Sequence, residues 1–271
     1  MSAPALIGPA LLFCPADRPD RYLKALAAAD SVVLDLEDAV PAGRKQDARA
    51  ALSSSSLDPA RVIVRVNPAS SPEHAADLAA LRATGYRTLM LAKAEHPEQI
   101  AALAQWQVVA LCETPLGVLN AAALAAQPNV VALMWGAEDL IAAMNGRTSR
   151  FPDGRYRAVA QHARSTVLLA AAAHGKLAID SVCIDIGDLE GLAAEARDAV
   201  ASGFALKACI HPNQAPVVRE AFRPSAQQVA WAEQVIAAAR DGGVVAVDGQ
   251  MIDGPLVRQA EAVLAASPHE R

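Results

Sequence analysis

The chain has 271 residues, of which 53% are hydrophobic and only 4% aromatic, and its net charge at pH 7 is −5. This length suits a single large α/β barrel with one extensive core. The weak negative charge, without any basic block, argues against nucleic acid as a partner. No apolar run is long enough to span a membrane and the first ten residues lack a signal peptide's cationic start, so we expect a soluble, cytoplasmic protein.

Short apolar runs alternate along the chain with segments of helical period. Eight runs have the length of strands, at residues 10–15, 32–37, 62–67, 88–93, 108–114, 130–136, 179–185 and 206–212. Helical segments follow them, at 21–29, 44–52, 73–83, 98–104, 116–126, 156–174, 190–202 and 227–239. The strand runs are almost continuously apolar, which is typical of parallel strands buried on both faces. This alternation predicts a (β/α)8 TIM barrel, with a doubly wound open sheet as the alternative.

Two segments depart from a plain barrel. Residues 139–155 are polar and rich in glycine, asparagine and arginine, and are expected to form a long loop after the sixth strand. Residues after 242 fall outside the eight units, with a short apolar run at 244–247 and a helix expected to end near 266. We therefore expect a catalytic barrel domain at 1–242 and a C-terminal lid segment with a helix at 243–271.

Polar residues occupy nearly every expected strand end, where catalytic groups of such barrels gather. They are Asp35, Glu37, Asp38, Arg65, Asn67, Lys93, Glu113, Glu138, Asp139, Asp185 and His211. Several carboxylates converging on one barrel mouth need neutralising, and a hard divalent cation with oxygen ligands does this. Because no cluster of histidine and cysteine ligands accompanies them, Mg²⁺ is expected rather than zinc, with Mn²⁺ as the alternative.

Seven stretches resemble, in order, the signatures of the citrate lyase β-like (HpcH/HpaI aldolase/citrate lyase) family. They are 13–19 (Phe-Cys-Pro-Ala-Asp-Arg-Pro), 34–40 (Leu-Asp-Leu-Glu-Asp-Ala-Val), 64–67 (Val-Arg-Val-Asn), 113–117 (Glu-Thr-Pro-Leu-Gly), 136–140 (Gly-Ala-Glu-Asp-Leu), 210–214 (Ile-His-Pro-Asn-Gln) and 249–253 (Gly-Gln-Met-Ile-Asp). The sequence looks closest to stand-alone lyases of the citramalyl-CoA and malyl-CoA type. This resemblance implies a magnesium-dependent carbon–carbon lyase that cleaves a β-hydroxyacyl-CoA to acetyl-CoA and a 2-oxo acid, assembled as a homotrimer or hexamer.

The resemblance also implies roles for individual residues. Glu113 and Asp139 would be the direct Mg²⁺ ligands. Glu37, as a catalytic residue, and Asp38 would orient metal-bound waters. Arg65 would bind the carboxylate and carbonyl oxygens of the 2-oxo acid, because a planar fork of donors suits a carboxylate.

Three further contacts are implied. Backbone amides at the sixth strand end would complete the 2-oxo-acid site, at Gly136, Ala137 and Glu138. Arg18 and Lys24 would contact the phosphates of coenzyme A. Asp253, carried by the lid of an adjacent subunit, would exchange the proton at the methyl carbon of acetyl-CoA.

Structural roles stay open beside these. Asp139 could cap a short helix, Arg65 could pair with a neighbouring strand-end carboxylate, and the segment around Asp253 could cap its own barrel. Other functions also stay open: hydrolysis of the thioester after condensation, as in a malate synthase or malyl-CoA thioesterase; the citryl-carrier-protein lyase subunit of a citrate lyase complex; and a non-catalytic binding module.

Overall fold

The structure is a computed structural model that describes residues 6–240, 245–247 and 250–267. The chain divides into two compact units, Met1–Arg219 and Glu220–Arg271. The division expected after residue 242 lies outside the described residues, and helix α11 (Ala226–Arg240) groups with the second unit. No described helix is long and apolar enough to cross a membrane.

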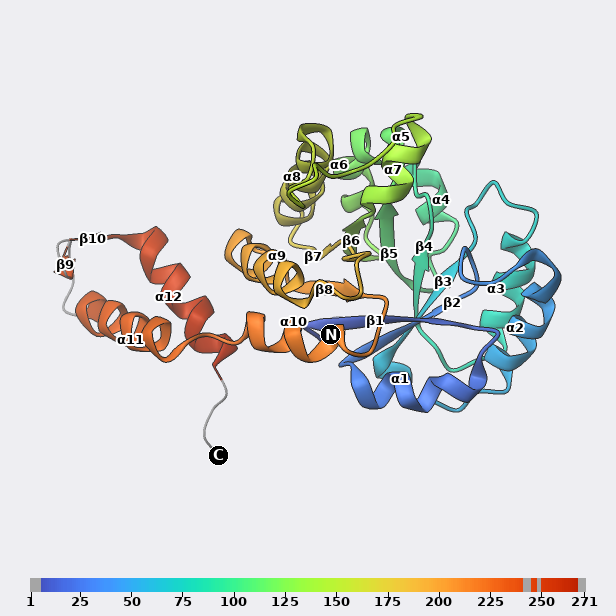
Figure 1. Ribbon diagram of the computed structural model, residues 1–271, viewed down its shortest axis with the longest axis horizontal. Coiled ribbons are helices and arrows are strands. Elements are labelled where there is room, and N and C mark those ends of the chain that lie inside the picture. Colours follow the sequence, from blue (N-terminus) through green and yellow to red (C-terminus); the bar gives the residue numbers. More distant parts are fainter. Residues whose placement is uncertain (1–5, 241–244, 248–249, 268–271) are drawn as a thin grey trace. The chain divides into compact units, whose positions relative to one another are not determined.

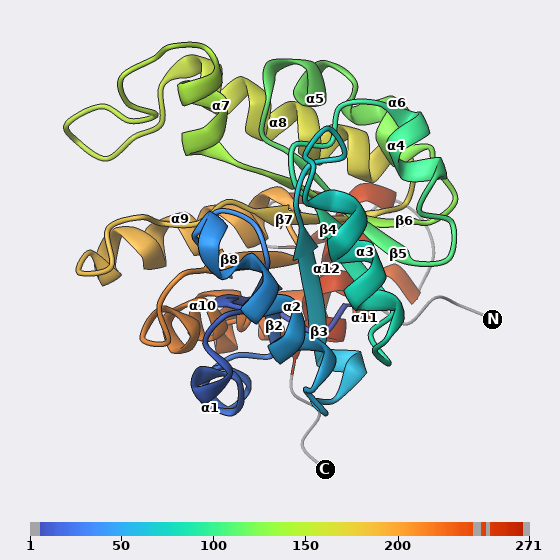
Figure 2. The same cartoon turned by 90° about the vertical axis from the view of Figure 1, so that its right-hand side faces the viewer.

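Eight parallel strands of the first unit close into a barrel (Figure 1, Figure 2). They are β1 (Ala10–Pro15), β2 (Ser31–Asp35), β3 (Val62–Val66), β4 (Thr88–Leu91), β5 (Gln107–Cys112), β6 (Val130–Trp135), β7 (Leu177–Asp180) and β8 (Leu206–Cys209). Each strand pairs with the next in sequence, and β8 pairs with β1. The closed order confirms the expected (β/α)8 barrel and excludes the open doubly wound sheet.

Helices alternate with the strands, and most of them lie in the helical segments expected from the sequence, but those at Ala137–Ala143 and Gln214–Phe222 were not expected. They are α1 (Tyr22–Ala28), α2 (Lys45–Ser53), α3 (His74–Arg82), α4 (Pro97–Ala101), α5 (Pro115–Leu119), α6 (Ala121–Ala125), α7 (Ala137–Ala143), α8 (Ala158–Ala173), α9 (Leu189–Ser202) and α10 (Gln214–Phe222). Short 3-10 turns precede α1, α2 and β3, at Pro19–Arg21, Ala42–Arg44 and Pro59–Arg61.

Strand β7 differs from the expected strand at 179–185. It ends at Asp180, and Asp185 lies in the loop that follows. The apolar run continues beyond the strand because Val182 packs against the barrel core and Cys183 is buried in the loop. Apolar side chains can thus be buried without being part of the strand, and the expected end at Asp185 was wrong.

The segment expected as a loop at 139–155 begins as a helix. Helix α7 starts directly after Gly136 and carries Glu138 and Asp139 in its first turn. Good helix formers follow, and carboxylates in a first helical turn interact favourably with the helix dipole. The loop itself therefore covers residues 144–157, between α7 and α8.

The barrel interior is filled by apolar side chains from all eight of its strands. The buried cluster contains Leu11, Val33, Ile63, Met90, Val109, Leu111, Ala132, Met134, Ile179, Leu206 and Ala208. A barrel of eight strands encloses just enough space for such layers of side chains. The interior is a packed core, so a site must lie at a mouth of the barrel.

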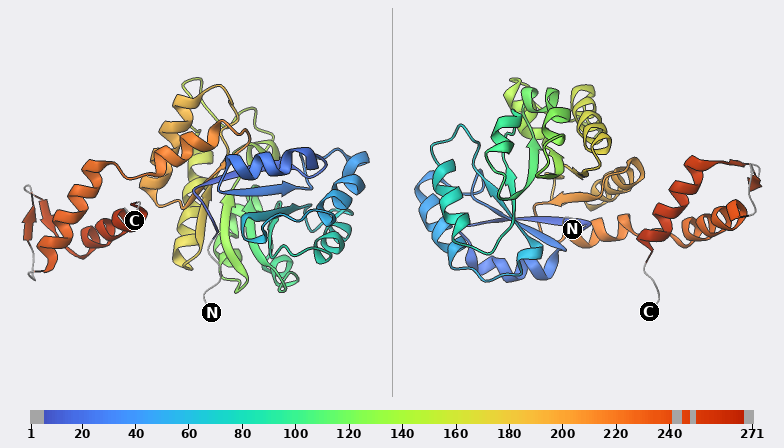
Figure 3. Two further views of the ribbon diagram at one scale, coloured as in Figure 1. Left: turned by 90° about the horizontal axis from the view of Figure 1, so that it is seen from below. Right: turned by 180° about the vertical axis from the view of Figure 1, so that it is seen from behind.

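The second unit has a small core of its own. Strands β9 (Val245–Val247) and β10 (Gln250–Ile252) form an antiparallel pair. Helix α12 (Gly254–Ala266) follows and packs against α11 (orange to red in Figure 3). Ala232, Val235, Ile252 and Ala260 are buried between these elements. The helix expected at the C-terminus is confirmed.

Candidate active site

Four carboxylates surround the ammonium group of Lys93 at the C-terminal ends of the strands. The distance from Lys93 Nζ is 2.5 Å to Glu37, 3.3 Å to Asp139, 3.6 Å to Asp38 and 3.9 Å to Glu113. These residues follow β2, β4, β5 and β6, which are separate strands in the sequence. The expected convergence of strand-end residues is therefore present.

Arg65 lies beside this cluster and is held by a buried carboxylate. Its Nε and Nη2 atoms donate to the two oxygens of Asp35 at 2.7 and 2.6 Å. Its Nη1 lies 3.2 Å from Glu37, and its guanidinium stacks 5.0 Å from the ring centre of Phe13. Asp35 also accepts the backbone amides of Glu37 and Ala39. One carboxylate thus fixes both the arginine and the loop that carries Glu37.

Glu113 is the most buried carboxylate of the cluster. Its Oε1 accepts the backbone amide of Lys93 at 3.0 Å. Burial, followed by the charge of Asp139, raises the pKa of Glu113 to about 8, although Lys93 and Arg65 act against this. Glu113 also needs Gly136 as a neighbour, because a Cβ on that residue would lie 2.8 Å from Glu113 Cβ.

The backbone of Lys93 contributes to the same arrangement. Lys93 has φ of 50°, in the left-handed region that residues other than glycine rarely adopt. Burial alone would lower the pKa of Lys93, but the hydrogen bond to Glu37 and the charges of Glu113 and Asp139 raise it above its usual value. Lys93 therefore stays charged and compensates part of the negative charge. Burial also raises the pKa of Glu37, against Arg65 and Lys93.

The start of α7 brings the remaining strand-end residues to this mouth. Asp139 is partly exposed, whereas Ala137 is buried. The amide of Ala137 donates to Ser181 Oγ at 3.4 Å, and Glu138 accepts from Ser149 at 2.6 Å. The side chain of Glu138, in the first turn of α7, is thus hydrogen-bonded to the loop that follows this helix.

The described contacts of the residues expected at the thioester are local. Arg18 pairs with Asp20, two residues away, and Lys24 is exposed on α1. Asp253, in the second unit, is exposed and caps α12 by accepting the amide of Leu256 at 3.5 Å. The contacts of Arg18 and Asp253 within their own elements do not by themselves indicate a catalytic role.

The cluster has the chemistry of a divalent-cation site. Five carboxylates, including Asp35, face the two cations Arg65 and Lys93, which leaves negative charge to be offset. No group of three or more candidate ligands lies close enough, within the described part of the chain, to form a preassembled metal cage. Magnesium commonly binds through one or two carboxylates and keeps waters or substrate oxygens as its other ligands. Glu113 and Asp139 fit that pattern.

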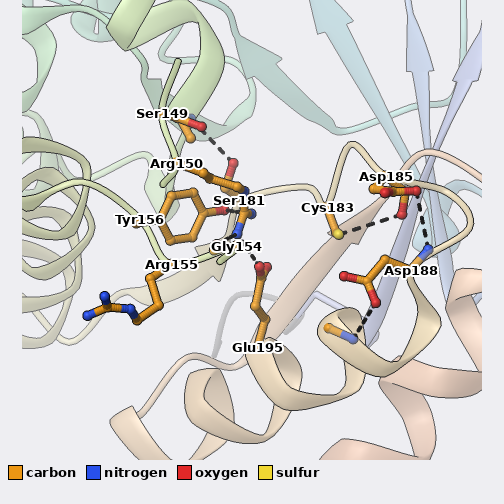
Figure 4. A network of polar contacts seen from close by, with 12 residues as sticks. Ser149, Arg150, Gly154, Arg155, Tyr156, Ser181, Cys183, Asp185, Asp188 and Glu195 are labelled. Carbon is orange, nitrogen blue, oxygen red and sulfur yellow. Dashed lines mark hydrogen bonds and ion pairs between the residues drawn. The ribbon is translucent and has the colours of Figure 1, made fainter. Parts of the chain in front are cut away.

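A separate cavity of about 980 Å³ lies between α8, α9 and the loop at 150–156. Figure 4 shows the polar network along it, with Arg150, Tyr156 and Glu195 pointing toward one another. This network involves Asp180 and Glu195, which sequence reasoning did not single out. Two features of the sequence could have indicated them: Asp180 is a polar residue that ends the apolar run of β7, and Glu195 is a half-buried acidic residue on α9.

A carboxylate cluster around a lysine, at the C-terminal mouth of a closed (β/α)8 barrel, defines a barrel enzyme. Residues 10–212 match the family HpcH/HpaI aldolase/citrate lyase. A citrate lyase subunit beta-like protein from Mycobacterium tuberculosis is 54% identical over 258 residues, covering 95% of this chain and 94% of the relative. The chain belongs to the HpcH/HpaI aldolase/citrate lyase family, and it is a lyase.

Two further comparisons agree with the family. The mitochondrial citramalyl-CoA lyase of Homo sapiens is 34% identical, covering 89% of this chain and 80% of the human protein. A crystal structure of protein CitE from Mycobacterium tuberculosis in complex with magnesium, acetoacetate and coenzyme A has a TM-score of 0.93 at 53% identity. The match covers 96% of this chain and 98% of that one. The expected membership of this family is thereby confirmed.

Proposed function

We propose that this chain is a Mg²⁺-dependent carbon–carbon lyase that cleaves a β-hydroxyacyl-CoA, such as citramalyl-CoA or malyl-CoA, to acetyl-CoA and a 2-oxo acid. The observation that carries the proposal is the convergence of Glu37, Asp38, Glu113 and Asp139 around Lys93, with Arg65 beside them. Magnesium, acetoacetate and coenzyme A in the related CitE structure support it, because these are a metal, an oxo acid and a thioester carrier of the required kinds.

Glu113 and Asp139 would hold the metal. When bound there, Mg²⁺ supplies Lewis-acid polarisation of the oxygen atoms of the leaving oxo acid. Glu37 and Asp38 would accept hydrogen bonds from water at the metal. Lys93 holds Glu37 in place, and its backbone amide orients Glu113.

Arg65 provides fixed positive charge where negative charge develops on the substrate oxygens. Because Asp35 occupies Nε and one proton of Nη2, the donors that it leaves are the second proton of Nη2 and those of Nη1, which lies 3.2 Å from Glu37. Arg65 therefore binds the oxo acid through its outer edge. The backbone at Gly136, Ala137 and Glu138 completes this part of the site, since glycine permits a close approach.

Three parts of the proposal concern the thioester side. Arg18 and Lys24 would contact the phosphates of coenzyme A. Residues 243–271 would act as a lid in a homotrimer or hexamer, and Asp253 would donate or remove the proton at the methyl carbon of acetyl-CoA in a neighbouring subunit. This role fits a carboxylate whose only contact within the described residues is a helix cap.

A substrate screen tests this function. Citramalyl-CoA, malyl-CoA, citryl-CoA and hydroxymethylglutaryl-CoA are each supplied with Mg²⁺, and 2-oxo acid and free CoA are followed separately. We expect a 2-oxo acid from at least one thioester, and loss of this activity in Asp139→Ala without loss of the fold. Free CoA without a 2-oxo acid would indicate thioester hydrolysis instead. Inactivity on all four, with activity on an acyl-carrier-protein thioester, would indicate a citrate lyase subunit.

A further inference from the structure

A closed ring of polar and aromatic contacts, with buried members on the strands and half-buried members on the loop and helix, lies beside β6, β7 and β8. Its members come from three strands, one helix and the loop at 144–157, and each contacts the next. They are Trp135, Asp180, Lys207, Glu195, Arg150 and Tyr156. The proposed reaction uses none of these side chains.

The strand side of the ring is centred on Asp180. Asp180 accepts Trp135 Nε1 at 2.7 Å and Lys207 Nζ at 2.9 Å, and Arg164 adds a third donor at 2.9 Å. Lys207 is fully buried and reaches Glu195 at 3.4 Å. Although burial acts in the opposite direction, Lys207 and Arg164 keep the pKa of Asp180 below its usual value. The carboxylate of Asp180 is therefore paired and stays ionised.

The loop side of the ring is centred on Arg150. Its guanidinium donates to Glu195, to Tyr156 Oη and, at 2.8 Å, to the carbonyl oxygen of Gly154. It also stacks 3.7 Å from the centre of the Tyr156 ring. Tyr156 in turn meets the Trp135 ring edge-on at 5.1 Å, which closes the ring. Figure 4 shows Arg150 between Tyr156 and Glu195.

Each side of the ring is connected to the turn that carries Asp139. Trp135 directly precedes Gly136 in the sequence. Ser181, next to Asp180, accepts the amide of Ala137 at 3.4 Å. Ser149, next to Arg150, is buried and donates to Glu138 at 2.6 Å. The ring thus holds the residues immediately before Asp139 from both sides.

We propose that Arg150 is a positioning residue, which acts through this ring to fix the turn at residues 136–139 and thereby the carboxylate of Asp139. The inference rests on the proposed function, because it concerns Asp139 as a metal ligand. Arg150 joins the loop to α9 and to Tyr156, and no other side chain makes both contacts in the described part of the chain. Without it, the loop at 144–157 loses its ion pair with Glu195 on α9 and keeps only the contact of Tyr156 with Trp135 in the ring.

The test compares Arg150→Met with Arg155→Met. Arg155 lies in the same loop and has the same side chain, but it is exposed and its described contacts, with Asp153 and with the Phe151 ring, stay within the loop. Mn²⁺ serves as the probe, and its dissociation constant is measured by calorimetry on the full chain, together with the circular dichroism spectrum. We expect Arg150→Met to weaken Mn²⁺ binding about tenfold or more, as is usual when an outer partner of a metal ligand is lost. Arg155→Met should bind Mn²⁺ as the wild type does.

A purely structural role would lower the melting temperature of Arg150→Met and leave its Mn²⁺ affinity unchanged, and that result would overturn the inference. If Arg150→Met does not fold, Ser149→Ala replaces it, since this change removes only the hydroxyl group that holds Glu138. Unchanged Mn²⁺ binding by Ser149→Ala would then be the contradicting result. Failure of the wild-type chain itself to bind Mn²⁺ would instead refute the proposed metal site, on which this inference depends.

Discussion

Asp35 and Arg65 lie side by side on β2 and β3 and are joined by two parallel hydrogen bonds. Both side chains are buried, and the register of the parallel strands places them opposite one another. The Nε and Nη2 donors of Arg65 are therefore already bound to a carboxylate within the protein. Arg65 is held rigid in this way and can offer only its outer edge to a substrate.

Loss of the charge on Asp35 should destabilise the protein. Asp35→Asn leaves Arg65 buried with only Glu37 nearby, and removal of one partner of a buried ion pair costs about 3–5 kcal/mol of unfolding free energy. We expect the loss of unfolding free energy to lie toward the lower end of this range, because Glu37 remains as an ion-pair partner of Arg65. Denaturant unfolding measures it. The control is Asp47→Asn, whose partner Arg44 is also exposed; it should change the unfolding free energy by less than about 1 kcal/mol. Equal stability of the two variants would show that the buried pair contributes little.

Arg65→Lys should reduce turnover strongly, although it keeps the positive charge. Lysine has no planar fork, so it cannot bind Asp35 through two donors and a substrate oxygen through a third. We expect a fall in kcat/KM of about a hundredfold or more, since a preorganised donor to a developing oxyanion commonly contributes that much. Steady-state kinetics on the thioester found active in the screen measures it. A value of kcat/KM equal to that of the wild type would refute the role of Arg65.

Metal affinity should depend on pH through Glu113. Burial raises the pKa of this carboxyl to about 8 in the metal-free protein, and only the ionised form can ligate. The apparent affinity for Mn²⁺ should therefore weaken as the pH falls below 8, by up to about tenfold per pH unit. Calorimetric titrations between pH 6 and 9 measure this. An affinity that is constant across this range would contradict the assignment.

The same shift predicts a change in stability without metal. The pKa of Glu113 is higher in the folded state than the usual 4.5, so the folded state binds more protons between these values. The free energy of unfolding should then fall as the pH rises from 4.5 to 8. Glu113→Gln cannot ionise, so the difference between wild type and this variant should change with pH in that direction. If the unfolding free energies of the two proteins change with pH in parallel, the raised pKa of Glu113 in the folded state is contradicted.

Gly136→Ala should damage the metal site with little effect on the backbone. The φ angle at Gly136 is −122°, which alanine adopts easily, but the new Cβ would lie 2.8 Å from Glu113 Cβ and 2.9 Å from its Oε2. Glu113 must move, so we expect Mn²⁺ affinity to fall at least about tenfold. Gly43→Ala is the matched control, because its Cβ would meet no atom within 4 Å. Equal metal affinity in both variants would show that Glu113 tolerates displacement.

The barrel and the convergence of polar residues at its mouth could be predicted because the pattern that indicates them is local in the sequence. Apolar runs and the polar residues that end them placed Glu37, Lys93, Glu113 and Asp139 at one mouth, and seven of the eight strands begin within one residue of the expected position. The end of β7 was wrong because buried loop residues extend the apolar run beyond it.

Contacts between distant side chains could not be predicted in the same way. The sequence left open that Arg65 pairs with a neighbouring strand-end carboxylate, but that this carboxylate is Asp35 depends on the register between β2 and β3. The pairing of Arg150 with Glu195 likewise depends on where a loop folds back against a helix 45 residues later. Such pairs depend on three-dimensional packing, which periodicity and strand-end patterns do not predict.

Asp253 should act on a neighbouring subunit if the lid segment of one subunit covers the barrel mouth of the next. Inactive Asp253→Asn and inactive Glu113→Gln chains are mixed, with different tags to demonstrate subunit exchange. Some mixed sites would combine an intact Glu113 with an intact Asp253, so we expect partial recovery of activity. The two variants kept in separate tubes provide the control. Mixed oligomers that form and stay inactive would show that Asp253 does not act between subunits.

The central claim is that the metal-bound site breaks a carbon–carbon bond. The most direct measurement follows citramalyl-CoA with the purified chain and quantifies acetyl-CoA, pyruvate and free CoA by mass spectrometry. We predict equal amounts of acetyl-CoA and pyruvate, complete arrest by EDTA, and recovery when Mg²⁺ is restored in excess. Release of free CoA and citramalate in place of these products, or cleavage that continues undiminished in EDTA, would contradict the account.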